Sequence, residues 1–103
     1  MTGAEIRQLL LAKWGYSYDI QLRRISPNQV QLQVMWRYQE QLSFPLSEAE
    51  YLQHLDTIAS HLQAWGTADQ FRQFMQTTKH KPRLGKPVVL SLNLGERAVE
   101  WLV

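Results

Sequence analysis

The sequence predicts an α+β fold in which a small antiparallel sheet packs on helices, in the order α-β-β-(β)-α-α-β-α. Two observations support this prediction. Apolar residues recur every three or four positions in some segments and every second position in others, the periods of helices and strands respectively. Helix-capping patterns precede the helical segments. The chain has 103 residues, of which 45% are apolar and 19% charged, so we expect one domain over residues 1–103.

Four segments are predicted to be helical because a capping pattern precedes each. The patterns are Thr2…Glu5, Ser47…Glu50, Thr67…Gln70 and the looser Asn93…Glu96. The first helix is expected over Gly3–Trp14, with Gly15 ending it. The second is expected over Ser47–Trp65, where apolar residues recur at helical spacing before Gly66. The third is expected to start at Thr67, and a short last helix to cover Gly95–Leu102.

Strands are predicted where the apolar period changes to two. Residues 18–23 and 30–38 alternate in this way, and Ser26-Pro27-Asn28 between them favours a turn, so these segments predict an antiparallel hairpin. A third strand is an option at 42–46, where Leu42, Phe44 and Leu46 continue the alternation. A later strand is expected over Pro87–Leu92, with proline at its first position.

The apolar faces of these elements are expected to meet in one core. Its predicted members are Leu9, Leu32, Val34, Leu55, Ile58, Leu62, Phe74, Leu90 and Trp101. The strand alternation also places Trp36 and Tyr38 with the core residues, which leaves no aromatic platform for stacking bases.

Composition excludes several classes of protein. There is no cysteine, which excludes disulfides and thiolate chemistry and fits a reducing compartment. The longest apolar run, residues 9–12, is far shorter than the ~20 residues that span a bilayer. The N-terminus lacks the basic and apolar regions of a signal peptide. We therefore expect a cytoplasmic protein with no membrane insertion.

Catalytic and metal-binding signatures are also missing from the sequence. No nucleophile elbow, zinc-protease or phosphate-loop pattern occurs, so no catalytic residue or cofactor is predicted; an enzyme whose site has no local signature stays an alternative. Glu50, His54 and His61 share one flank of the second predicted helix. The two histidines are about 10 Å apart along the axis, too far to share one ion directly, so no metal site is predicted.

The charge of the chain is concentrated in one segment, residues 79–86. This segment holds Lys79, Lys81, Arg83 and Lys86 and no acid, whereas the whole chain has a net charge of only +2. Pro82, Gly85 and Pro87 predict an exposed connector between the third helix and the last strand. Such a cluster attracts acidic partners. The sequence therefore favours a non-enzymatic binding or assembly-type protein that engages an acidic protein, and a solvated connector without a partner is the plain alternative.

Nucleic-acid binding, with RNA as the ligand, is the competing functional hypothesis. The polar face of the predicted sheet would display Gln21, Arg23, Gln31, Gln33 and Arg37, and the basic segment would contact phosphates. The modest net charge and the acids of the second helix, Glu48, Glu50 and Asp56, argue against it. The sequence does not indicate an oligomeric state.

Several segments resemble a small family of cyanobacterial and plant-chloroplast proteins. The resemblance lies in Trp14–Asp19 with Gln21–Arg23, in Val34–Trp36, in Phe44–Leu52, and in Arg83–Lys86 with Leu94–Ala98. It covers essentially the whole chain. The family is functionally uncharacterised, so the resemblance implies no catalytic residues. It implies a soluble protein of an oxygenic phototroph, and the absence of an N-terminal extension suits a cyanobacterial member.

Overall fold

The computed structural model of the chain describes residues 1–94 and confirms the predicted α+β fold class. The elements in order are α1 (Gly3–Trp14), β1 (Tyr18–Ser26), β2 (Gln29–Tyr38), α2 (Glu48–Ala64), α3 (Ala68–Thr77) and β3 (Val88–Asn93). The expected last helix, with its capping pattern Asn93…Glu96 and the predicted core residue Trp101, lies outside the described residues.

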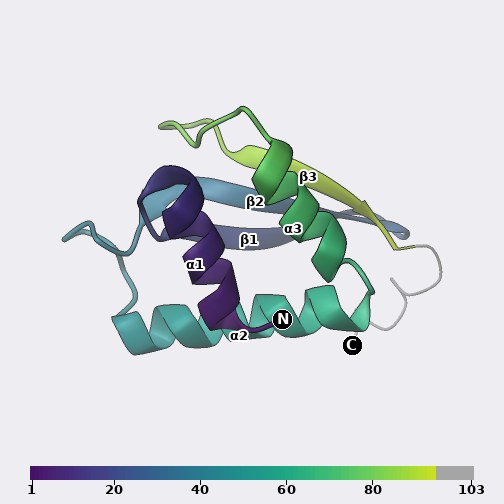
Figure 1. The fold of residues 1–103 in the computed structure, drawn as a ribbon, viewed down its shortest axis with the longest axis horizontal. Coiled ribbons are helices and arrows are strands. Elements are labelled where there is room, and N and C mark those ends of the chain that lie inside the picture. Colours follow the sequence, from purple (N-terminus) through teal and green to yellow (C-terminus); the bar gives the residue numbers. More distant parts are fainter. Residues whose placement is uncertain (95–103) are drawn as a thin grey trace.

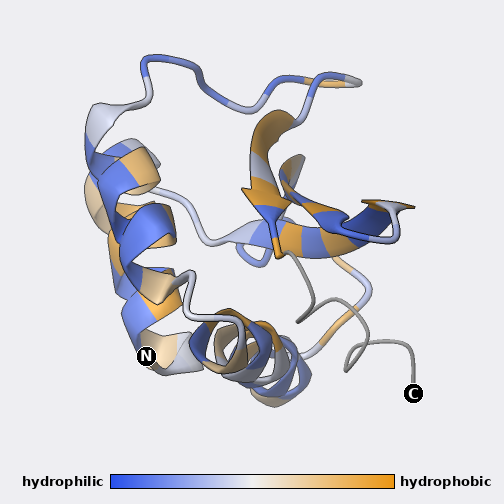
Figure 2. Ribbon diagram, turned by 90° about the vertical axis from the view of Figure 1, so that its right-hand side faces the viewer, coloured by the Kyte–Doolittle hydropathy of each residue, from blue (hydrophilic) through white to orange (hydrophobic). Residues whose placement is uncertain are grey.

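The sheet is antiparallel, with strand order β1-β2-β3, and the described helices lie to one side of it (Figures 1 and 2). The predicted hairpin forms: β1 and β2 flank a turn at Pro27-Asn28. The pairing shifts between Tyr18↔Tyr38 and Ile20↔Val34, so β2 bulges at residues 35–37. β3 pairs regularly with β2, from Gln29↔Asn93 to Val34↔Val88.

The core lies between the sheet and the helices and contains most of the predicted residues. Fully or almost fully buried are Leu32, Val34, Leu55, Ile58 and Leu62. Leu9, Phe74 and Leu90 are partly buried and pack against this cluster. Tyr51 and Phe71 are the largest fully buried side chains and come from α2 and α3. The apolar helical face therefore meets the apolar strand face, as the two periods predict.

The helix starts use their predicted caps to different degrees. Ser47 and Glu50 form a complete capping box, so α2 begins at Glu48 and Ser47 is its cap. Thr2 accepts from the Glu5 N–H at 3.1 Å, but the Glu5 carboxylate binds Arg72 instead of returning to the cap. Thr67 is the N-cap residue of α3, as predicted, but its expected capping box does not form: the hydroxyl makes no cap bond and donates to Leu62 O at 3.2 Å.

The prediction of an optional third strand at 42–46 is also wrong. Residues 39–46 form turns, in which Gln41 N–H donates to Tyr38 O and Phe44 N–H donates to Gln41 O. Phe44 and Leu46 pack against the core, whereas Leu42 is fully exposed. The alternating apolar residues here therefore belong to a loop, from which Phe44 and Leu46 pack against the core.

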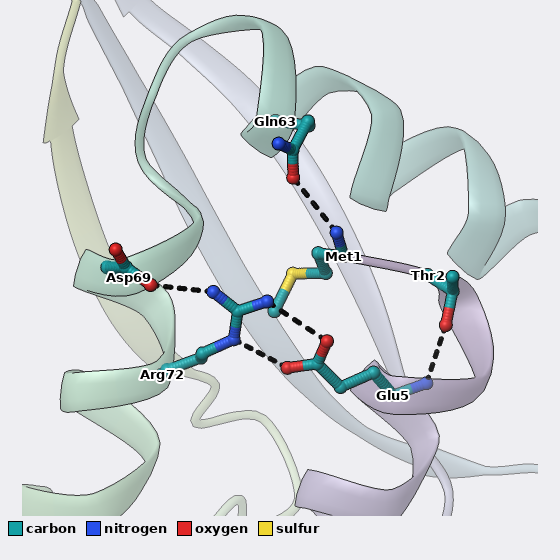
Figure 3. A network of polar contacts seen from close by, with 6 residues as sticks. All are labelled: Met1, Thr2, Glu5, Gln63, Asp69 and Arg72. Carbon is teal, nitrogen blue, oxygen red and sulfur yellow. Dashed lines mark hydrogen bonds and ion pairs between the residues drawn. The ribbon is translucent and has the colours of Figure 1, made fainter.

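Arg72 on α3 ties α3 to the N-terminal end of α1, beside the contact between Met1 and α2 (Figure 3). Its guanidinium donates to both carboxylate oxygens of Glu5, at 2.5 and 3.0 Å, and to Asp69 Oδ1 at 2.6 Å. The Met1 ammonium group donates to Gln63 Oε1 on α2 at 2.9 Å. The hydrogen bonds from Arg72 lower the pKa of Glu5, which stabilises its charged form.

Candidate functional site

The four predicted partner-binding cations lie on the segment between α3 and β3, residues 78–87, here called the basic loop. Arg83 and Lys86 exchange two backbone hydrogen bonds, Arg83 N–H to Lys86 O at 3.1 Å and Lys86 N–H to Arg83 O at 2.7 Å. Leu84 and Gly85 form the turn between them, and Gly85 has a φ of +76°, a conformation that favours glycine. The tip of the basic loop is therefore a closed turn and not a continuation of α3.

The charged side chains of the basic loop are exposed to solvent and have no ion-pair partner within residues 1–94. Lys79, Lys81, Arg83 and Lys86 are all exposed, as is His80. Among the described residues, no carboxylate lies within ion-pair distance of these four cations. Pro82 is buried and anchors the loop, while Leu84 at the tip is 87% exposed. The loop thus presents a cluster of positive charges, unpaired by any carboxylate of residues 1–94, beside one large apolar side chain.

A hollow of about 500 Å³ separates the basic loop from the start of β3. In Figure 2 the loop crosses the top of the molecule from the helical layer to the sheet. The hollow is lined by Lys79, His80, Lys81, Arg83, Lys86, Pro87, Val88 and Val89. The cations of this site stand out in the sequence, whereas Val88 and Val89 do not, since only the folded chain brings the strand beside the loop.

The polar sheet face assembles four of the five residues of the alternative nucleic-acid site. Gln21 pairs across the sheet with Gln33, and Arg23 with Gln31. Gln33 Nε2 also donates to Gln31 Oε1 at 2.7 Å, which links the two glutamines of β2. Arg37 is exposed but lies beyond the last regular pair, in the bulge of β2. The assembled group therefore contains one cation, Arg23.

The aromatic side chains of β2 differ from each other in position. Tyr38 packs against the core as predicted and contacts Tyr18 with ring centroids 5.6 Å apart. The prediction for Trp36 is wrong: it is half-buried but does not belong to the core cluster. The bulge at residues 35–37 interrupts the alternation from which its position was predicted.

The two histidines of α2 contact other parts of the fold and are not arranged to bind one metal ion together. His54 Nε2 lies 2.6 Å from Ile20 O on β1 and 3.5 Å from Asp19 Oδ1. His61 stacks on Trp65 at 5.2 Å. Within residues 1–94 no group of three histidine, aspartate or glutamate side chains is spaced to hold a metal ion.

Tyr51 and His54 cap the outer edge of the sheet. The Tyr51 hydroxyl donates to Tyr18 O at 2.7 Å, one helical turn from the contact between His54 and Ile20 O. Burial raises the pKa of Tyr51, and the negative charge of Asp19 adds to the effect, so the phenol stays protonated and remains a donor. These contacts assign His54 to protection of a strand edge.

These features define a small α+β domain whose helices cover one face of an antiparallel sheet and whose basic loop stands apart from both. The chain belongs to the family described as domain of unknown function DUF3067, whose model matches residues 4–102. It is also similar to Alr2454 from Nostoc sp. strain PCC 7120, a structural genomics target solved by solution NMR, with 57% identity and a TM-score of 0.87. That similarity covers 100% of this chain and 98% of the Nostoc chain.

The comparisons confirm the predicted membership of an uncharacterised family with a cyanobacterial member. No curated protein matches the chain significantly. None of the helices within residues 1–94 has both the length and the hydropathy that a bilayer-spanning helix needs.

Proposed function

We propose that this protein is a non-enzymatic binding or assembly-type protein that engages an acidic protein partner through Lys79, Lys81, Arg83 and Lys86. The observation that carries the proposal is the gathering of these four exposed cations around one hollow, with no ion-pair partner in the described part of the chain. Positive potential of this kind raises the rate of encounter with an acidic surface and orients it. The absence of cysteine supports a cytoplasmic setting as part of the proposal.

Apolar contacts beside the charges would hold the partner after encounter. Leu84 is 87% exposed at the loop tip, and Val89, which lines the hollow from the strand side, is 39% exposed. Charged groups on a surface contribute mainly to association rate and specificity, whereas desolvated apolar contacts slow dissociation. The basic loop and the start of β3 therefore offer both elements of a binding site within one short stretch of sequence.

Nucleic-acid binding through the sheet face has less support. The assembled group Gln21, Arg23, Gln31 and Gln33 contains a single cation, and the glutamines of β2 already bind each other. Affinity for a phosphate backbone grows with the number of phosphates neutralised. Arg23 and the short basic loop, on which this alternative rests together, would neutralise few phosphates at once.

The test compares two variants of equal charge change in capture and kinetic experiments. The Arg83→Gln/Lys86→Gln variant removes two charges from the basic loop, and the matched Arg23→Gln/Arg37→Gln variant removes two elsewhere. Immobilised proteins are incubated with a cyanobacterial lysate at low and high salt, and retained proteins are identified by mass spectrometry. The association rates of the identified partner are then measured.

We expect an acidic protein to be retained at low salt. Its association rate should be lower with the Arg83→Gln/Lys86→Gln variant than with the wild type, and equal to the wild-type rate with the Arg23→Gln/Arg37→Gln variant. The difference should shrink at high salt because screening weakens exposed charges. Equal capture by both variants, or retention of nucleic acid that only the Arg23→Gln/Arg37→Gln variant loses, would overturn it.

A further inference from the structure

The outward-facing backbone groups of β3 can be assigned from two hydrogen bonds. Leu94 N–H donates to Asn28 O at 2.8 Å and continues the register in which Leu92 faces Val30. Antiparallel strands exchange hydrogen bonds at every second pair, so Val88, Leu90 and Leu92 bond to β2. The N–H and C=O groups of Val89 and Ser91 then point to the open edge. The contact between Gln70 Nε2 and Ser91 O, 3.4 Å long, agrees with this assignment.

The two edges of the sheet are protected differently. On β1 the carbonyls of Tyr18 and Ile20 are capped by side chains of α2. On β3 the carbonyl of Ser91 is capped by Gln70 of α3. Within residues 1–94, no hydrogen bond from a helix or loop reaches the outward groups of Val89. Unprotected edge groups are the usual template for an added strand.

The open position of β3 coincides with the hollow of the basic loop. Val88 and Val89 form its strand side, and Lys79, Lys81, Arg83 and Lys86 form much of the remainder. A chain that entered the hollow would thus find a backbone donor and acceptor on one side and cations around it. Carboxylate side chains complement those cations, and the exposed Val89 side chain offers an apolar contact.

We propose that an extended acidic peptide segment of the partner adds to the edge of β3 at Val89, as a further strand of the sheet, with its carboxylates facing the basic loop. This inference rests on the proposed function and specifies the form of the partner. Main-chain hydrogen bonds supply affinity in strand addition, and the flanking side chains supply selectivity. The charges of the basic loop select an acidic sequence.

The test is an NMR titration of the whole protein with synthetic peptides. The probe is a blocked octapeptide of alternating glutamate and valine. One control peptide carries glutamine in place of glutamate, and a second keeps the glutamates but has every amide nitrogen methylated. The readouts are the dissociation constant and the hydrogen-exchange rate of the Val89 amide. The Val89→Pro variant removes the outward N–H, and the matched Val89→Ala variant keeps it.

We expect the acidic peptide to bind and to slow exchange of the Val89 amide, which exchanges faster than those of Leu90 and Leu92 in the unbound protein. Methylation of the peptide and Val89→Pro should each weaken binding about tenfold or more, the size of one or two lost hydrogen bonds. The dissociation constant of the Val89→Ala variant should stay within a few-fold of the wild-type value. If the Val89→Pro variant does not fold, the exchange rate of the Val89 amide in the wild-type protein, measured with and without the acidic peptide, decides whether the peptide adds to the strand.

The negative outcomes separate the two proposals. Equal binding of the methylated and unmethylated acidic peptides would overturn strand addition and leave the charge-based function standing. Strand addition alone is also overturned if the acidic peptide does not bind the wild-type protein while the Arg83→Gln/Lys86→Gln variant captures less of the protein partner than the wild type does. Absence of peptide binding together with unchanged partner capture by that variant would overturn both.

Discussion

The backbone N–H of Gly3 donates to the Asp56 carboxylate at 2.7 Å and joins the first turn of α1 to the middle of α2. The first amides of a helix lack partners within the helix, so Asp56 satisfies one of them and also places a negative charge at the positive end of α1. A Cβ atom on Gly3 would lie 2.6 Å from Asp56 N and 2.9 Å from Leu52 O. The start of α1 therefore rests directly on the backbone of α2.

Replacing Gly3 with alanine should destabilise the fold despite the better helix propensity of alanine. The methyl group would meet backbone atoms of α2, and overpacking of this kind costs about 1–3 kcal/mol. Urea unfolding measures the change, and Gln8→Ala on the exposed side of α1 is the control, with an expected effect within about 0.5 kcal/mol. A Gly3→Ala protein as stable as the parent would show that the two helices do not touch there.

The pair Glu5–Arg72 should make stability depend on acid pH. Hydrogen bonds from Arg72 hold the pKa of Glu5 below its usual value of 4.5 in the folded state. The stabilisation is therefore complete above pH 4.5 and is lost as pH falls through the lowered folded pKa. Both side chains are about one-third exposed, so solvent screening keeps the contribution small.

Unfolding curves between pH 3 and 7 measure this contribution. The Glu5→Gln and Arg72→Gln variants should each flatten the same part of the stability profile, and the double variant should flatten it no further. Additive effects of the two substitutions would mean that the side chains act separately.

Leu55 and Leu62 should each be essential to the core. Both are fully buried, and substitution of such a leucine by alanine costs about 2–5 kcal/mol, a large share of the stability of a small domain. Leu42 provides the matched control because it is fully exposed in the loop before α2. Chemical denaturation should show a large loss for each core variant and almost none for Leu42→Ala; near-neutral values at both core positions would contradict the packing of α2.

Periodicity was sufficient to predict the helices and strands of the described residues, but not the loops between them. Thr67 fits a capping pattern, yet both its N–H and its hydroxyl donate to Leu62 O. Thr67 therefore closes the C-terminal turn of α2 and also directly precedes α3, and Gly66, with a φ of +70°, makes the reversal possible. At 42–46 the apolar alternation resembles that of a strand, although its hydrogen bonds are those of turns.

The candidate site was predictable from the sequence only in its charges. Four cations without an acid stand out in a sequence whose net charge is +2. The role of His54 was not predictable, because it depends on which strand forms the sheet edge and where α2 crosses it. The same holds for Val89, whose backbone is a docking candidate only because β3 is the last strand of the sheet.

Removal of the Tyr51 hydroxyl should test the protection of the β1 edge. In the Tyr51→Phe variant, Tyr18 O loses the donor 2.7 Å away while the ring of residue 51 keeps its buried place. A buried acceptor without a partner costs about 1–3 kcal/mol. The control is Tyr16→Phe, since Tyr16 is 40% exposed and its hydroxyl can bond to water. Thermal or urea unfolding that does not distinguish the two variants would remove the capping role of Tyr51.

Nucleic-acid affinity should be weak and strongly dependent on salt. The sheet face assembles one cation, and the cations of the basic loop occupy a short segment, so few phosphates can be neutralised together. Each neutralised phosphate of a single strand adds about 0.7 to the slope of log affinity against log salt. We expect binding of a mixed-sequence RNA oligonucleotide, measured by fluorescence anisotropy, to disappear by about 150 mM salt.

The RNA affinity of the Arg23→Ala/Arg37→Ala variant should then differ little from that of the parent at any salt concentration. Sub-micromolar binding at that salt concentration, abolished in this variant, would identify the polar sheet face as the functional surface and would displace the acidic-partner proposal.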